Sequence, residues 1–181
     1  MMEDLSLHIL DIAENAVRAG ATRITLTVIE DERRDLLKIE VLDNGGGMSP
    51  WTLRRALSPF FSSKGKRIGL GLPLLVQAAE QCGGGVSIRT AAGKGTKVTA
   101  RFRYGHIDRP PLTNMKGTVM ALVMGHAEIG LLYRHDRNGR MYRFRSRRFL
   151  GPSAAFAGLD PDSIGRIARH LESGLRRIGR T

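Results

Sequence analysis

Two segments of alternating apolar and polar residues, 22–30 and 35–42, are separated by only four polar residues. Each segment is rich in the β-branched and aliphatic side chains that favour strands. A short polar connection between two such segments is typical of a β-hairpin. A chain with this pair must therefore build an antiparallel sheet, and its remaining elements must pack on or beside that sheet.

A predicted helix precedes the hairpin, and further helices and strands follow it. Residues 4–19 place Leu5, Ile9, Ile12 and Ala16 on one apolar stripe, and Gly20 ends the predicted helix. The rest of the first part is predicted to contain helices over 49–57 and 70–81, strands over 86–90 and 96–104, and a loop over 58–68. We expect this first domain to span residues 1–104. A small extension over 105–181 would hold a helix (114–124), a hairpin (128–135 and 140–149) and a helix (161–178).

Composition excludes several classes of protein. A chain of 181 residues with 41% hydrophobic residues can bury a core, and 25% charged residues are ordinary for a folded domain. Its one cysteine, Cys82, permits no intrachain disulfide. The first residues lack the order of a signal peptide, and the apolar runs are too short to cross a bilayer. We therefore expect a cytoplasmic protein with no membrane segment.

Positive charge is concentrated in the extension. The whole chain carries a formal net charge of +12, and residues 105–181 hold 14 Lys and Arg against 6 Asp and Glu. Such an asymmetry suits a nucleic acid, a membrane surface or an acidic protein as partner. A solvated basic surface with no partner is the simpler interpretation of the same charge.

Neither common phosphate-binding motif is present, because the chain contains no P-loop and no Rossmann glycine pattern. Four other elements occur instead in a definite order. They are Asp11-Ile-Ala-Glu-Asn15-Ala on the first helix, Asp43-Asn-Gly45-Gly-Gly47-Met48 after a strand, Pro59-Phe60-Phe61-Ser-Ser-Lys64 leading to Gly69-Leu70-Gly71-Leu, and Gly93-Lys-Gly95-Thr96 before the last strand of the first domain. Each alone also fits an ordinary loop or helix surface.

Together, these elements resemble the GHKL (Bergerat-fold) ATPases, which include gyrase-type topoisomerases, heat-shock chaperones, histidine kinases and mismatch-repair proteins. The resemblance covers roughly the first 100 residues and is carried by the four motifs in their order. It implies an α+β fold, a two-layer sandwich of helices on a sheet, with the small α/β extension outside the family pattern. It also implies that ATP and Mg²⁺ are bound.

The resemblance assigns roles to residues of the motifs. Asp43 would accept a hydrogen bond from the adenine amine, whereas guanine presents an acceptor there. Gly45 and Gly47 would let the backbone approach the base, and the carbonyl oxygen of Asn15 would bind Mg²⁺. Thr96 would support Asp43 through water. The remaining residues expected to contact the nucleotide are Met48, Phe61, Lys64, Gly69, Leu70 and Gly71, with Lys64, or failing it Lys66 or Arg67, neutralising the terminal phosphate.

Catalysis is less strictly specified. Asp11 lies four residues before Asn15, on the same helix face, where hydrolysing members of the family carry a glutamate that activates water. Aspartate is one methylene shorter and leaves both hydrolysis and phosphoryl transfer open. Arg18 also departs from the mismatch-repair pattern, which has aspartate there. None of the five histidines stands in the context of a phosphoacceptor helix, so any acceptor would belong to another protein.

Three functions follow from these patterns. The first is an Mg-ATP-dependent protein kinase or phosphotransfer module with Asp11 and Lys64 as catalytic residues, acting on a partner protein in a regulatory role. The second is an ATP-gated binding switch reset by slow hydrolysis. The third is a basic nucleic-acid-binding protein, which the few paired aromatic residues and the lack of a recognisable reading motif in the extension disfavour.

Overall fold

A six-stranded mixed sheet forms the centre of the computed structural model, which describes residues 4–57, 71–150 and 159–180. The strand order is β3-β4-β2-β1-β5-β6, and all neighbours are antiparallel except β1 and β5, which are parallel. The strands are β1 (Arg23–Asp31), β2 (Leu36–Asp43), β3 (Gly85–Thr90), β4 (Thr96–Arg103), β5 (Gly130–Arg137) and β6 (Arg140–Arg145).

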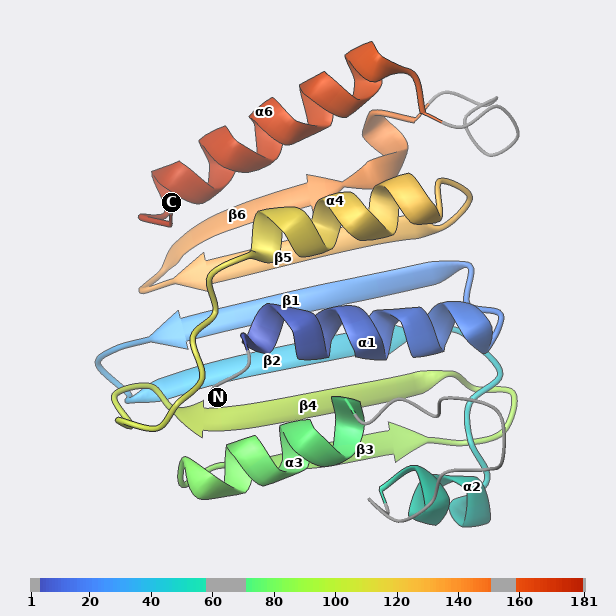
Figure 1. Cartoon of the computed structure of the whole chain (residues 1–181), viewed down its shortest axis with the longest axis vertical. Coiled ribbons are helices and arrows are strands. Elements are labelled where there is room, and N and C mark those ends of the chain that lie inside the picture. Colours follow the sequence, from blue (N-terminus) through green and yellow to red (C-terminus); the bar gives the residue numbers. More distant parts are fainter. Residues whose placement is uncertain (1–3, 58–70, 151–158, 181) are drawn as a thin grey trace.

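Helices form a second layer on one face of this sheet (Figure 1). This layer contains α1 (Leu5–Arg18), α3 (Gly71–Gln81), α4 (Met115–Gly125) and α6 (Pro161–Arg177), and the short α2 (Pro50–Ala56) lies near one end of the strands. The arrangement confirms the expected α+β two-layer sandwich. Among the described residues, the helices are too short or too polar to traverse a lipid bilayer.

Local signals in the sequence explain the boundaries of the first elements. The Asp4 side chain accepts a hydrogen bond from the Ser6 amide and caps α1, and Gly20 leaves the helix with a φ of +76°. The buried side of α1 presents Leu5, Ile9 and Ile12 to the sheet. Apolar residues of β1 and β2 alternate toward the same side, so the helix and the hairpin share one core.

The extension continues the sheet of the first 104 residues. β5 pairs with β1 over eight register positions, from Arg23 opposite Gly130 to Glu30 opposite Arg137, and β6 completes the edge. The division of the chain at residue 104 stays a prediction, and the two parts share one sheet and one apolar core. The predicted strand over 140–149 is shorter than expected. It ends at Arg145 because the Ser146 hydroxyl accepts from the Leu131 amide and a 3₁₀ turn follows.

A buried ion network holds the C-terminus to the sheet. Glu30 on β1 is fully buried, and His135 Nε2 on β5 lies 2.6 Å from its Oε1 atom. Arg180, just beyond α6, donates to both carboxylate oxygens and also to the Leu112 carbonyl oxygen. The Tyr133 hydroxyl lies 2.6 Å from His135 Nδ1 and completes the chain of contacts. Every charge in this network therefore has a partner, as buried charges require.

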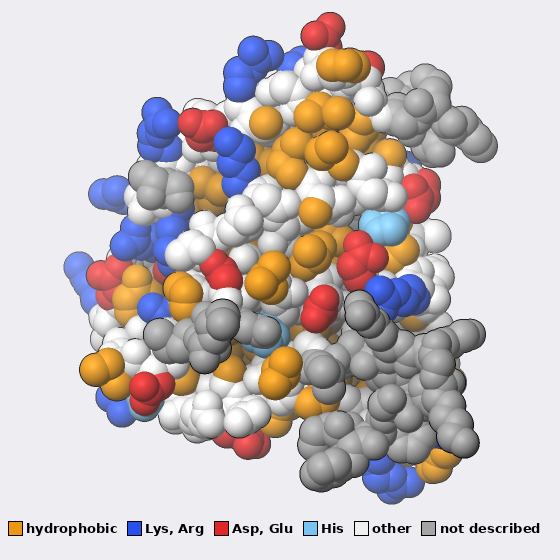
Figure 2. Space-filling view, viewed as in Figure 1, with side chains coloured by type: hydrophobic (Ala, Val, Ile, Leu, Met, Phe, Trp, Pro, Cys, Tyr) orange, Lys and Arg blue, Asp and Glu red, His pale blue; other side chains and the backbone are white. Residues whose placement is uncertain are grey.

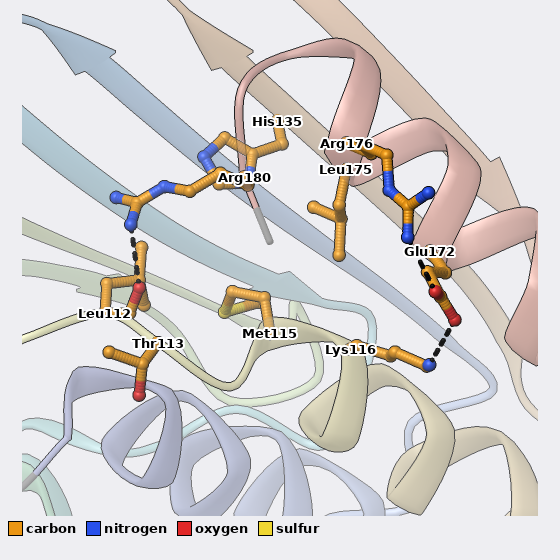
Figure 3. Close-up of a pocket in the computed structure, with 9 residues that line it drawn as sticks. All are labelled: Leu112, Thr113, Met115, Lys116, His135, Glu172, Leu175, Arg176 and Arg180. Atoms are coloured by element: carbon orange, nitrogen blue, oxygen red, sulfur yellow. Dashed lines mark hydrogen bonds and ion pairs between the residues drawn. The ribbon is translucent and has the colours of Figure 1, made fainter.

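Beside this network lies a cavity whose charged lining residues already have partners within the protein (Figure 3). It has a volume of about 300 Å³ and lies between α4, α6 and the segment that precedes α4. Lys116 and Arg176 both contact the Glu172 carboxylate, at 2.9 and 3.0 Å, and Arg180 is held by Glu30 and Leu112. We therefore attribute this cavity to the packing of the extension.

The Glu30 carboxylate gives the fold a dependence on pH. Burial raises its pKa, but the hydrogen bonds from His135 and Arg180 outweigh burial and lower the pKa to about 2. Glu30 therefore stabilises the folded state above its ordinary pKa of 4.5, and this contribution is lost as the pH falls from 4.5 toward 2.

We expect Glu30→Gln to lower the free energy of unfolding by roughly 3 kcal/mol at pH 7, because Arg180 loses its buried counter-charge. The difference from the wild type should shrink as the pH falls from 4.5 toward 2. Urea unfolding at several pH values measures both effects. Glu80→Gln, at an exposed position on α3, is the control and should change little. Equal stability of Glu30→Gln and wild type at pH 7 would contradict the structural role.

Candidate functional site

A cavity of about 500 Å³ opens beside α1, α2 and the ends of β2 and β4. It contains five of the residues that the sequence predicted for a nucleotide site: Asn15, Asp43, Gly47, Met48 and Thr96. Much of the remaining wall is apolar, which suits a flat aromatic ring. These further lining residues include Ile12, Ala16, Trp51, Ala56, Leu72 and Val98.

Asp43 is the one carboxylate among the described residues that line this cavity. It is the last residue of β2, on the side of the sheet that faces the helices, and only 8% of its surface is exposed. The Gly45 amide donates to its Oδ1 atom at 2.8 Å. Among the described residues, nothing donates to Oδ2. An accessible oxygen on an otherwise buried carboxylate that lines a cavity suits a ligand that brings its own N–H group.

Hydrogen bonds join the loop after Asp43 to the segment between α1 and β1. Asn44 Oδ1 accepts from the amides of Thr22 and Arg23, at 3.0 and 2.8 Å, and its amide nitrogen donates to the Thr22 hydroxyl at 2.9 Å. The Gly46 amide donates to the Ala19 carbonyl oxygen at 2.8 Å. Asn44 therefore positions the loop, a role that its place within the motif did not reveal.

Two threonines that are register partners on β3 and β4, Thr90 and Thr96, contact the other side of this loop. Thr96 is the register partner of Asp43, and its hydroxyl lies 3.0 Å from the hydroxyl of Thr90. Thr90 also accepts from the Met48 amide at 2.9 Å and donates to the Gly95 carbonyl oxygen at 3.0 Å. The sequence pointed to Thr96 alone. The role of Thr90 follows from the pairing of β3 with β4, which places Thr90 opposite Thr96.

Glycine is required where the two loops meet. Gly47 has a φ of +64°, and a Cβ atom there would lie 1.9 Å from the Ala91 carbonyl oxygen. Gly95 has a φ of +76°, and a Cβ atom there would lie 2.1 Å from the carbonyl oxygen of Asp43. Backbone approaches this close exclude any side chain. The loop after β2 and the loop between β3 and β4 therefore form one tightly packed wall.

Asn15 lies at the exposed rim of the cavity, one turn of α1 away from Asp11. Its Oδ1 atom, the predicted magnesium ligand, accepts from Arg18 Nη1 at 3.2 Å. Arg18 also lines the cavity and brings a positive charge to the rim. The sequence offered no role for Arg18, and the structure places it beside the atom expected to face the phosphates.

Asp11 contacts the first turn of α3. A Cβ atom on Gly71, the first residue of α3, would lie 2.7 Å from Asp11 Oδ2, so this contact depends on glycine. The described residues that line the cavity do not include Asp11, Gly45 or Gly71. Gly45 acts instead through its hydrogen bond to Asp43. Four predicted site residues, Phe61, Lys64, Gly69 and Leu70, lie outside the described residues, as do Lys66 and Arg67.

Protein side chains alone do not form a metal centre in the described parts of the chain. No group of three or more His, Cys, Asp or Glu side chains is placed to hold an ion there. This agrees with the usual binding of Mg²⁺ in nucleotide sites, where one or two protein groups combine with phosphate oxygens and water. Asn15, at the rim, is a side chain of the right kind for that role.

The fold is a two-layer α/β sandwich, and comparison with known proteins identifies the family. Residues 3–106 match the family described as histidine kinase-, DNA gyrase B- and HSP90-like ATPase. The chain belongs to this family, which confirms the resemblance to the GHKL ATPases, and it carries an ATP-binding histidine kinase-like ATPase domain.

Sensor kinases are among its curated relatives. The sensor protein DegM of Bacillus sp. (strain B21-2) is 31% identical over 90 residues, which are 50% of this chain and 24% of that protein. The sensor protein kinase FleS of Pseudomonas aeruginosa is 38% identical over 93 residues, covering 50% and 23%. The sensor histidine kinase ZraS of Klebsiella oxytoca is 36% identical over 92 residues, covering 50% and 20%. The matched stretch thus spans less than a quarter of these relatives.

A solved structure extends the likeness of fold into the extension. The crystal structure of the N-terminal domain of a DNA repair protein matches 86% of this chain and 57% of that chain, with a TM-score of 0.59 and 16% sequence identity. At this identity the match concerns the fold alone. Because it covers more than the 104 residues of the family match, it includes part of the extension.

The close packing at Gly47 can be tested by substitution. We expect Gly47→Ala to lower the free energy of unfolding by about 2 kcal/mol or more, because the new Cβ atom meets the Ala91 carbonyl oxygen and the φ is positive. Gly93→Ala is the matched control, since Gly93 has a φ of +73° but no atom within 4 Å of a new Cβ. Urea unfolding of both variants separates the steric clash at Gly47 from the cost of a positive φ, which both positions share. An equal loss of unfolding free energy in the two variants would refute the close approach at Gly47.

Proposed function

We propose that the cavity beside Asp43 binds Mg-ATP and that the protein is a kinase or phosphotransfer module acting on a partner protein in a regulatory role. The single observation that carries the proposal is the Asp43 carboxylate, which lines an otherwise largely apolar cavity and has one oxygen with no donor among the described residues. We expect the protein to act in the cytoplasm, where ATP and Mg²⁺ are available.

Adenine fits the inner part of the cavity. Asp43 Oδ2 would accept from the exocyclic amine of adenine, whereas guanine has an oxygen at that position and would face the carboxylate with no proton to donate. Ile12, Met48 and Val98 offer apolar surface for the two faces of the ring. Gly47 keeps the loop close enough to Asp43 for the base to be enclosed.

The phosphates and Mg²⁺ would lie at the rim. Asn15 Oδ1 would bind the ion, and Arg18, which now donates to that oxygen, would turn toward the phosphates. The backbone N–H groups at the beginning of α3, near Gly71, would face the phosphate oxygens. By the family resemblance, Lys64 would neutralise the terminal phosphate and Phe61, Gly69 and Leu70 would contact the nucleotide.

We favour phosphoryl transfer because aspartate is one methylene shorter than the glutamate that activates water in hydrolysing members of the family. The Asp11 carboxylate lies against Gly71, at the same turn of α3 whose N–H groups would face the phosphates. In transfer, the γ-phosphoryl group would pass from ATP to a partner's side chain, which loses a proton, and ADP would be released. An ATP-gated switch with slow hydrolysis by Asp11 is the alternative.

Calorimetric titration of ATP, with and without Mg²⁺, tests the site. We expect Asp43→Ala to weaken ATP binding about 10- to 100-fold, the value of one hydrogen bond to a charged group. Asn15→Ala should bind ATP equally with and without Mg²⁺. Asp162→Ala removes an exposed carboxylate on α6 and should bind as the wild type does. ATP binding by folded Asp43→Ala at wild-type affinity would refute the assignment.

Release of phosphate separates transfer from switching. Incubated alone with Mg-ATP, the wild type is expected to bind nucleotide and release little inorganic phosphate, because the acceptor lies on another protein. Asp11→Asn should keep wild-type ATP affinity in the same calorimetric titration. Steady phosphate release by the wild type that Asp11→Asn abolishes would instead establish the ATP-gated switch.

A further inference from the structure

The sheet face opposite the helices is strongly cationic. In the strands, alternate residues point away from the helices, and on that side no described helix covers them (Figure 1). Within the described strands, three carboxylates lie on this face, those of Asp31, Glu40 and Asp136, and Asp35 in the hairpin turn reaches Arg103 there. Nine cationic side chains lie there: Arg23, Lys38, Arg89, Lys97, Arg101, Arg103, Arg134, Arg143 and Arg145. We call this surface the open face.

The helical side of the molecule has a different character. Figure 2 shows acidic, basic and apolar side chains interspersed over the helices. The strands of the open face hold nine cations against three carboxylates, whereas the rest of the chain holds 20 cations against 14 carboxylates. The ratio of cations to carboxylates is therefore highest on the open face.

Strand register places cations directly opposite one another on the open face. Arg89 pairs with Lys97, Lys38 with Arg101, and Arg134 with Arg143. Like charges directly opposite in neighbouring strands destabilise a sheet, and oppositely charged or neutral pairs would stabilise it. Glu40 offsets one cation in each of the first two pairs, whereas neither Arg134 nor Arg143 has an ion pair within the described residues, so an anionic partner would offset the cost of that third pair.

Most of these arginines have no counter-charge of their own. Glu40 holds Lys38 and Lys97, at 2.8 and 2.5 Å, and Asp35 holds Arg103 at 3.0 Å. Within the described residues, the other six cations of the open face make no side-chain hydrogen bond or ion pair: Arg23, Arg89, Arg101, Arg134, Arg143 and Arg145.

Protection of sheet edges does not explain this pattern. Charged residues on edge strands prevent one sheet from pairing with another, and Arg143 and Arg145 on β6 could serve that purpose. Arg134, Lys38 and Arg101 lie on β5, β2 and β4, which are interior strands. Cations on interior strands cannot block an edge.

We propose that the open face binds the phosphate backbone of double-stranded nucleic acid, independently of its sequence. The face is about 25 Å across its six strands, which lie about 4.8 Å apart, and about 20 to 30 Å along strands of six to nine residues, which matches a stretch of duplex. Duplex DNA presents one charge per about 1.7 Å of axis, and arginine guanidinium groups pair with phosphate oxygens in a bidentate manner. No aromatic side chain lies on the open face within the described strands, so single-stranded bases would find nothing to stack on.

The test is fluorescence anisotropy with a labelled 30-base-pair DNA duplex of arbitrary sequence, titrated with the whole protein at several salt concentrations. We expect binding to weaken linearly with salt on a log–log plot. The triple variant Arg101→Gln, Arg143→Gln, Arg145→Gln should reduce that slope by about three units, roughly one for each phosphate contact. Arg54→Gln, Arg169→Gln, Arg177→Gln removes equal charge from the helical side and should keep the wild-type slope.

Two further measurements make the outcome decisive. Thermal unfolding should show the triple variant folded and at least as stable as the wild type, because it relieves two like-charge pairs. Vesicles containing about 30% phosphatidylserine test a membrane surface as the source of the anions. The proposal is overturned if the wild type fails to bind duplex at 50 mM salt, if both triple variants lose equal slope, or if single-stranded DNA or vesicles bind more tightly than duplex.

Discussion

The pairing of β1 with β2 is the contact on which the rest of the structure depends. These two strands form the middle of the sheet, with β4 paired to β2 and β5 paired to β1. Helix α1 packs its apolar stripe on them, and the end of β2 delivers Asp43 to the cavity. A shift of one residue in this register would turn Asp43 and the buried Leu37, Ile39 and Val41 toward the open face.

Two buried carboxylates on this hairpin have opposite roles. Glu30 near the end of β1 is surrounded by donors from His135 and Arg180, so its charge is fully compensated within the protein. Asp43 at the end of β2 receives one backbone donor and keeps one oxygen free among the described residues. The first arrangement stabilises the fold, and the second is suited to a ligand, although both groups lie on the same side of the same pair of strands.

The two faces of the sheet carry different kinds of side chain. The side covered by helices holds the cavity with its apolar walls and its free carboxylate oxygen, and the open side holds the arginines. Asn44, the residue after Asp43, accepts from the backbone amide of Arg23, whose side chain lies on the open face. The proposed nucleotide site and the cationic face are therefore built on a shared strand end.

Local patterns in the sequence determined most of the elements and the composition of the site. Period-2 and period-3.6 spacing and the capping of α1 by Asp4 are short-range, so the helices and the first hairpin could be predicted from neighbouring residues alone. The same is true of the Asp43–Gly47 loop, a contiguous motif. Only the tertiary structure decided that β5 joins β1 as a parallel strand, since no local pattern specifies a partner 100 residues away. It also decided the roles of Thr90 and Arg18 and the gathering of cations on one face, because these depend on strand register and on contacts between distant segments.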